Sequence, residues 1–144
     1  MKKKICNLII TILVIALIVV IAMIIIRYGK NYLNEKEISK TLTTIEEELS
    51  NQSLNNENEV LDVEYKGYKI EGIIEIPEIN IKYPIINETN EETMKISVTK
   101  FSGPQANEIG NYCVAGHNNR DGTMFGKTSH LKIGDTIKLT NLKN

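Results

Sequence analysis

The feature that most constrains this chain is an apolar run near its N-terminus, from Ile5 to Ile26. The run has roughly 22 residues, and a helix of that length extends about 33 Å, which is enough to cross the hydrocarbon core of a membrane. Asn7 and Thr11 are its only polar residues, so such a helix has no polar face to turn toward water. Residues 1–30 are therefore predicted to form a transmembrane helix.

The flanks of this run indicate how the helix is used. Lys2–Lys4 precede it, as in a secretory signal, but the run is longer than the apolar part of such a signal and no small-residue cleavage site follows it. The pattern indicates an uncleaved signal anchor. Basic residues lie on both sides, and the short basic head with a long polar remainder favours a cytoplasmic N-terminus. The sequence thus predicts a single-pass protein of the cell membrane with an extracytoplasmic C-terminal domain.

The charge outside the membrane excludes some partners. Lys2–Lys4 account for +3 of the formal charge of −1, so residues 27–144 carry −4. An acidic domain of this kind argues against nucleic acid as a partner and against a polybasic membrane patch. The two cysteines, Cys6 at the membrane edge and Cys113 in the domain, cannot pair within one chain, so this is not a disulfide scaffold.

Two different patterns follow the apolar run. Ile38, Leu42, Ile45 and Leu49 recur at spacings of four, three and four, which places them on one face of a short juxtamembrane helix. The next ten residues, SNQSLNNENE, are polar and Asn-rich and predict a linker. The predicted organisation is a transmembrane helix at 1–30, a juxtamembrane helix and linker at 31–59, and a folded domain at 60–144.

From Val60 onward the apolar residues alternate, which is the period of half-buried strands. The alternation runs through Tyr68–Ile76, and Pro77 predicts a break or a sheet edge because proline cannot donate to a strand ladder. Residues 93–98 are expected to form a short helix or turn, and Thr136–Thr140 a further strand. Successive strands with Gly, Pro and Asn turns predict an antiparallel β sandwich or barrel.

One stretch of this domain carries a candidate catalytic group. Tyr112–Lys127 reads YCVAGHNNRDGTMFGK, and it begins as a strand and ends in a cluster of turn formers around His117. A histidine at the end of a buried strand, exposed by a loop, is well placed for acid/base chemistry. Taken alone, a lone histidine is more often structural, so the rest of the chain must decide its role.

Four segments together resemble the sortase family, which are membrane-anchored cysteine transpeptidases of Gram-positive bacteria. Residues 72–81, GIIEIPEINI, resemble the first barrel strand of that family, and residues 111–117, NYCVAGH, resemble the strand that ends in its catalytic histidine. Residues 117–125, HNNRDGTMF, are similar to class B members, whereas residues 131–137, LKIGDTI, are similar to a turn of classes A and D. The subclass features are therefore mixed.

The resemblance implies a mainly β fold, a partial sortase-type antiparallel β-barrel behind the two helices. It also implies a reaction in which a Cys thiolate attacks the threonyl carbonyl of a C-terminal sorting motif, and an amine of a cell-wall precursor or pilin resolves the acyl-enzyme. In the family a His supplies acid/base function and an Arg binds the substrate or oxyanion. Of these three groups the resemblance assigns only His117, and it implies no cofactor.

The nucleophile and the arginine of the family lie on later strands, in motifs that this sequence lacks. Cys113 precedes His117 by four residues, about 13 Å along a strand, which is too far for a nucleophile and its base. Cys113 is therefore predicted to be a buried core cysteine, Arg120 a solvated loop charge and His130 a surface residue. His117, Asp121 and His130 do not have the spacing of a metal site.

Three hypotheses follow for the function. The first is a C-terminally truncated sortase fragment, inactive alone, whose incomplete barrel is marginally stable or prone to aggregation unless something completes it. The alternative is a non-catalytic, membrane-anchored extracytoplasmic β module that binds a peptide or surface partner, with a structural His117. The third is a half-enzyme completed in trans by a chain that carries the Cys and Arg strands.

Overall fold

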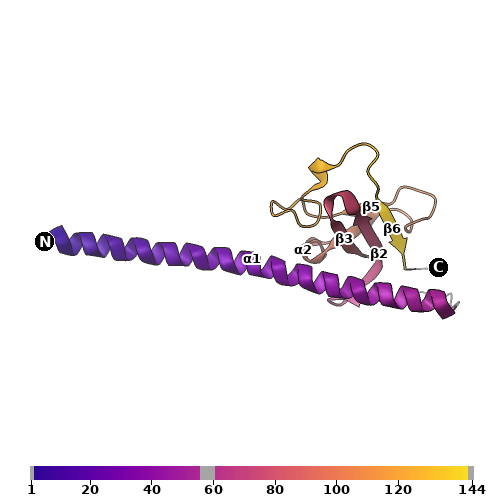
Figure 1. The fold of residues 1–144 in the computed structure, drawn as a ribbon, viewed down its shortest axis with the longest axis horizontal. Coiled ribbons are helices and arrows are strands. Elements are labelled where there is room, and N and C mark those ends of the chain that lie inside the picture. The colour runs from indigo at the N-terminus through magenta and orange to yellow at the C-terminus, as the bar shows by residue number, and fades with distance from the viewer. Residues whose placement is uncertain (1, 56–60, 143–144) are drawn as a thin grey trace. The chain divides into compact units, whose positions relative to one another are not determined.

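The computed structural model describes residues 2–55 and 61–142, with side chains for residues 3–51 and 61–142. The chain divides into two compact units, Met1–Glu37 and Ile38–Asn144, and each is described by itself. One helix, α1 (Lys2–Asn55), labelled in Figure 1, takes the place of the two helices predicted. Nothing in the sequence ends it early, because this segment has no proline and Gly29 costs a helix only about 1 kcal/mol.

The predicted linker is therefore partly wrong. Residues 50–55 belong to the end of α1, and residues 56–59 lie outside the described part of the chain. The boundaries predicted at residues 30 and 59 otherwise remain predictions.

The first unit presents apolar side chains that no other part of that unit covers. The large apolar residues from Ile5 to Ile26 are all about half exposed or more. The stretch Lys3–Asn51 of α1 contains a window long and apolar enough to cross a membrane, and it is the one helix of this kind in the described ranges. By length and composition, this agrees with the predicted transmembrane helix.

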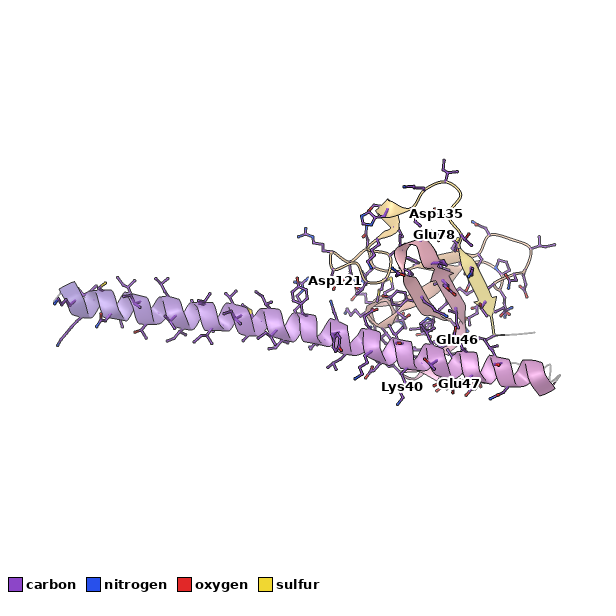
Figure 2. All side chains as sticks on the ribbon, viewed as in Figure 1. Lys40, Glu46, Glu47, Glu78, Asp121 and Asp135 are labelled. Atoms are coloured by element: carbon purple, nitrogen blue, oxygen red, sulfur yellow. The ribbon has the colours of Figure 1, made fainter. Side chains whose placement is uncertain are left out.

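The second unit begins with the C-terminal part of α1, whose predicted apolar face is confirmed. Ile38, Leu42 and Ile45 are 2%, 6% and 0% exposed and belong to the hydrophobic core. Glu46 forms an ion pair with Lys82 on a strand of the sheet. Figure 2 shows Glu46 on the side of α1 that faces the sheet. This part of α1 therefore belongs to the folded unit and is not a free spacer.

A six-stranded sheet forms the rest of this unit, with β2 at its centre. The order is β1-β2-β3-β4-β5, and β6 pairs with β2 beside β1 (Figure 1). The strands are β1 (Glu64–Tyr65), β2 (Tyr68–Ile76), β3 (Ile81–Ile86), β4 (Val98–Ser102), β5 (Cys113–Ala115) and β6 (Lys138–Asn141).

The prediction of a purely antiparallel sheet is wrong, because β3 and β4 pair in parallel through Ile85↔Val98 and Ile86↔Thr99. A parallel pair needs a connection that returns the chain to the same end of the sheet. Here α2 (Glu91–Ile96) makes this crossover, and Asn90 caps it by accepting hydrogen bonds from the amides of Glu92 and Thr93. Among the described residues no pairing joins β5 to β6, so the sheet is not shown to close into a barrel.

A glycine marks an irregularity in β2, and Pro77 ends the strand as the sequence predicted. The register between β2 and β3 shifts between Ile70 and Gly72, and a Cβ at Gly72 would lie 2.6 Å from the carbonyl oxygen of Thr140 on β6. Pro77 ends the strand and begins η1 (Pro77–Ile79). The last strand was expected at Thr136–Thr140 and starts two residues later, because the Thr136 amide donates to Glu78 on η1 instead of to a strand. Figure 2 labels Glu78 and also Asp135, which directly precedes Thr136.

Candidate functional site

His117 lies just beyond β5, where the chain leaves the sheet. Ala115, the last residue of β5, pairs with Thr99 of β4. The next residue, Gly116, is closely packed, because a Cβ there would come within 2.9 Å of Val98 and 3.0 Å of the Phe125 ring. His117 then turns out of the sheet with an exposed side chain. The predicted exposure of His117 in a loop after a strand is therefore confirmed, whereas the strand itself is half-buried and not buried as predicted.

The backbone after this histidine folds back on itself. We call residues 117–126 the histidine loop. Asn118 forms an isolated antiparallel bridge with Met124, and the Phe125 amide donates to the His117 carbonyl oxygen at 3.0 Å. At the base of the loop, the Met124 amide donates to the hydroxyl of Tyr83 on β3 at 2.9 Å. The loop is thus held at His117 by a backbone hydrogen bond and at Met124 by a hydrogen bond to the Tyr83 side chain.

Side chains inside the turn stabilise the same loop. Asp121 accepts hydrogen bonds from the amide and the hydroxyl of Thr123, at 3.1 and 2.7 Å, and Asn119 donates to that hydroxyl at 2.9 Å. Figure 2 shows Asp121 on this loop, beyond the edge of the sheet. A Cβ at Gly126 would collide with the Asn119 carbonyl oxygen, so the turn closes tightly against the loop's last residue.

Cys113 is half-buried in β5, so the prediction of a buried core cysteine is wrong in degree. Its thiol makes a weak contact of 3.9 Å, in which Sγ donates to the Asn111 carbonyl oxygen. The residue lies at the N-terminal end of a strand whose other end leads to His117. A base and its nucleophile must approach to about 3 Å, and an extended strand between the two residues prevents this.

The other candidates take the places predicted for them. Arg120 and His130 are exposed, the first in the turn of the histidine loop and the second at the end of η2 (Thr128–His130). Within residues 2–55 and 61–142, no three His, Cys, Asp or Glu side chains lie close enough together to hold a metal ion. Asp121 stabilises the turn by accepting hydrogen bonds from Thr123.

A buried polar cluster was missed by the sequence analysis. The Glu71 side chain is 5% exposed and pairs with Lys100 of β4 at 2.8 Å, and the Lys100 ammonium lies 5.7 Å from the centre of the Tyr112 ring. Burial and, to a smaller extent, the charge of Glu71 raise the pKa of Tyr112 well above its usual value of 10.0. The Tyr112 hydroxyl is buried and finds no hydrogen-bond partner among the described residues.

The position of Glu71 explains why this cluster was missed. Strict alternation along β2 leaves Glu71 on the polar face, but the register shift between Ile70 and Gly72 turns it inward. The neighbouring Gly72 was the signal, since a glycine inside a strand often marks a bulge. A cavity of about 390 Å³ lies beside the cluster, lined by Glu71 and by polar side chains that include Lys69, Asn87 and Gln105.

Part of the folded unit is similar to one known protein family. The family model of the sortase domain matches residues 74–144. A sortase A of Listeria monocytogenes is 33% identical over 81 residues, which cover 56% of this chain and 36% of that protein. Over these residues the chain is similar to the sortase family.

Two solved structures share the fold. A sortase D5 transpeptidase of Clostridium perfringens superposes with a TM-score of 0.50 and 23% identity, over 77% of this chain and 67% of that one. Sortase C of Streptococcus pneumoniae does so with a TM-score of 0.50 and 20% identity, over 73% and 67%. At these identities the likeness shows the fold alone. The chain spans little more than a third of the Listeria relative's length.

Proposed function

We propose that this chain carries the acid/base histidine of a sortase-type cysteine transpeptidase, and that His117 is this residue. The observation that carries the proposal is the geometry of His117: it is exposed at the end of β5 and held by a tightly hydrogen-bonded loop. A histidine whose backbone is fixed and whose imidazole is exposed can meet and protonate a leaving amine. The similarity of residues 74–144 to the sortase domain supports the assignment.

The nucleophile and the oxyanion-binding arginine come, in this proposal, from outside these 144 residues. Cys113 sits on the same strand as His117, and Arg120 lies in the turn that follows it, so neither can face the imidazole as the reaction requires. The chain alone is therefore expected to form no acyl-enzyme. In the complete reaction, the substrate is a protein with a C-terminal sorting motif and the acceptor is an amine of a cell-wall precursor or pilin.

The long helix supports a location at the cell membrane. The apolar part of α1 would anchor the protein in a single pass, with the unit that contains His117 on the extracytoplasmic side. This is where sorting-motif proteins and their acceptors meet.

The test uses a chimeric protein that supplies the nucleophile and the arginine. Residues 61–142 replace the matching segment of the Listeria sortase A, so that the remainder of that relative supplies the rest of the active site. Transfer of a sorting-motif peptide to an amine is then measured for this chimera, for its His117→Ala variant and for the matched control His130→Ala. We expect His117→Ala to lower kcat at least about a hundredfold, in the range of general acid/base catalysis, and His130→Ala to leave it unchanged.

Two outcomes would contradict the proposal. If an active chimera kept its rate after His117→Ala, this residue would be structural, and the non-catalytic hypothesis would gain. If the ungrafted chain formed a thioester with a sorting-motif peptide, seen by mass spectrometry on Cys113, the inactivity of the chain alone would be wrong.

A further inference from the structure

Tyr83 is a core residue whose hydroxyl accepts a hydrogen bond from a distant backbone amide. It lies on β3, is 4% exposed, and accepts a hydrogen bond from the Met124 amide across 41 positions of sequence. A buried hydroxyl is costly to leave without a partner, and phenylalanine fills the same space without that cost. The presence of the hydroxyl in this position therefore needs a reason beyond packing.

Met124 supplies that reason, because its backbone is strained. Its φ of 50° lies in the left-handed region, which residues with a Cβ seldom adopt, and its side chain is 4% exposed. A non-glycine residue stays in this conformation only where its surroundings hold it there. The bond to Tyr83 and the bridge to Asn118 are the contacts that fix the Met124 backbone.

The strained residue is directly connected to the histidine. Phe125, which follows Met124, donates its amide to the His117 carbonyl oxygen, and its ring packs where a Cβ on Gly116 would lie. A shift of Met124 toward an ordinary φ would move the Phe125 amide and ring. The amide is bonded to His117 and the ring packs against Gly116, so the direction of the imidazole would change as well. We propose that the Tyr83 hydroxyl is the positioning group for His117. The inference concerns the orientation of His117, and its functional meaning rests on the proposed function.

A second tyrosine provides a matched control. Tyr112 also carries a buried hydroxyl, and it packs against the same core just before β5. Its hydroxyl has no hydrogen-bond partner in the described part of the chain, so removing it breaks no bond. Tyr83→Phe and Tyr112→Phe therefore each remove one hydroxyl oxygen from a core tyrosine. Of the two hydroxyls, the one on Tyr83 is bonded to the histidine loop.

The test uses the isotope-labelled full chain in detergent micelles. The sequence has two histidines, so His117 and His130 each give one imidazole signal, and the second is an internal reference. Amide hydrogen exchange is followed at Met124 and Phe125 in the same samples. In Tyr83→Phe we expect exchange at these two amides to accelerate about tenfold, and the His117 imidazole signal to shift or broaden while that of His130 stays unchanged. In Tyr112→Phe we expect neither effect.

Two results would overturn the proposal. One is a His117 signal in Tyr83→Phe that coincides with the wild-type signal. The other is an equal change of the His117 signal in Tyr112→Phe, which would mean that any disturbance of the core reaches the loop.

A milder variant covers the case in which Tyr83→Phe does not fold. Replacement of Tyr83 by 3-fluorotyrosine keeps the hydroxyl but makes it a weaker acceptor. The Met124 amide proton should then move upfield together with a change at His117, and an unchanged His117 signal would again overturn the proposal. Because the signals do not depend on turnover, a failure of the transpeptidase assay and a failure of this inference are separate results.

Discussion

At the scale of single residues, the ion pair of Glu71 and Lys100 is sensitive to substitution of either partner. The Glu71 side chain is 5% and that of Lys100 17% exposed, so removal of the ammonium leaves a largely buried carboxylate without its partner. We expect Lys100→Met to lower the free energy of unfolding by about 2–4 kcal/mol, somewhat less than for a fully buried pair. Urea unfolding of the full chain in detergent measures this.

The matched control removes both charges. In the double variant Glu71→Leu with Lys100→Met, no charge stays buried, and most of the lost stability should return. If the double variant is as unstable as Lys100→Met alone, the packing of these side chains matters and the unpaired charge does not.

Tyr112 makes the folding stability depend on pH in the alkaline range. Its pKa is raised in the folded chain by burial and by the charge of Glu71, whereas in the unfolded chain it stays near 10.0. Between these two values the unfolded chain loses the proton and the folded chain keeps it, so stability falls as pH rises above about 10 and is unaffected below. Tyr112→Phe should remove this part of the fall and leave the Glu71–Lys100 pair in place. The free energy of unfolding is measured at pH 9, 10 and 11 for the wild-type chain and for Tyr112→Phe. Equal losses of stability in the two proteins would contradict the assignment.

At the scale of elements, the C-terminal part of α1 behaves as a core element of the sheet. Ile45 is 0% exposed, whereas Glu47 on the same helix is exposed and lies on the opposite side from the sheet (Figure 2). We expect Ile45→Ala to cost about 2–4 kcal/mol of unfolding free energy, and Glu47→Ala to change it by no more than about 0.5 kcal/mol. Thermal unfolding followed by the near-ultraviolet signal of the sheet tyrosines measures both. Equal, small effects would mean that this helix can leave the sheet without loss.

Local patterns were sufficient for several elements. The apolar face of α1, the break at Pro77 and the position of His117 after β5 each depend on neighbouring residues, so periodicity and turn chemistry could predict them. The linker predicted after Leu49 was partly wrong, because this stretch has the composition of a linker while its first residues continue the helix. Composition alone does not end a helix that a packed face already holds.

The features that depend on distant partners could not be read in this way. The parallel pairing of β3 with β4 is set by the α2 crossover, and the inward turn of Glu71 by a bulge opposite β3. Tyr83 falls on the apolar face of its strand and looks like any core ring, because its partner Met124 is 41 residues further on. The histidine could thus be predicted, but the contact that we propose positions it could not.

At the scale of the whole molecule, the pairing of β2 with β6 sets the order in which the sheet can form during synthesis. Gly72 pairs with Asn141, so the part of β2 that pairs with β6, residues 72–75, lacks this partner until about 70 further residues have been made, roughly 4–14 s of translation. During that interval the chain carries an isoleucine-rich strand with an open edge, which is the kind of segment that pairs with other chains. We expect synonymous slow codons between residues 103 and 137 to raise the aggregated fraction of newly made protein, at an unchanged amino-acid sequence. The same codons placed before residue 61 should not do so, and pulse labelling followed by sedimentation distinguishes the two. The timing of translation, and not only the amino-acid sequence, thus becomes a determinant of how much of this protein reaches its folded state.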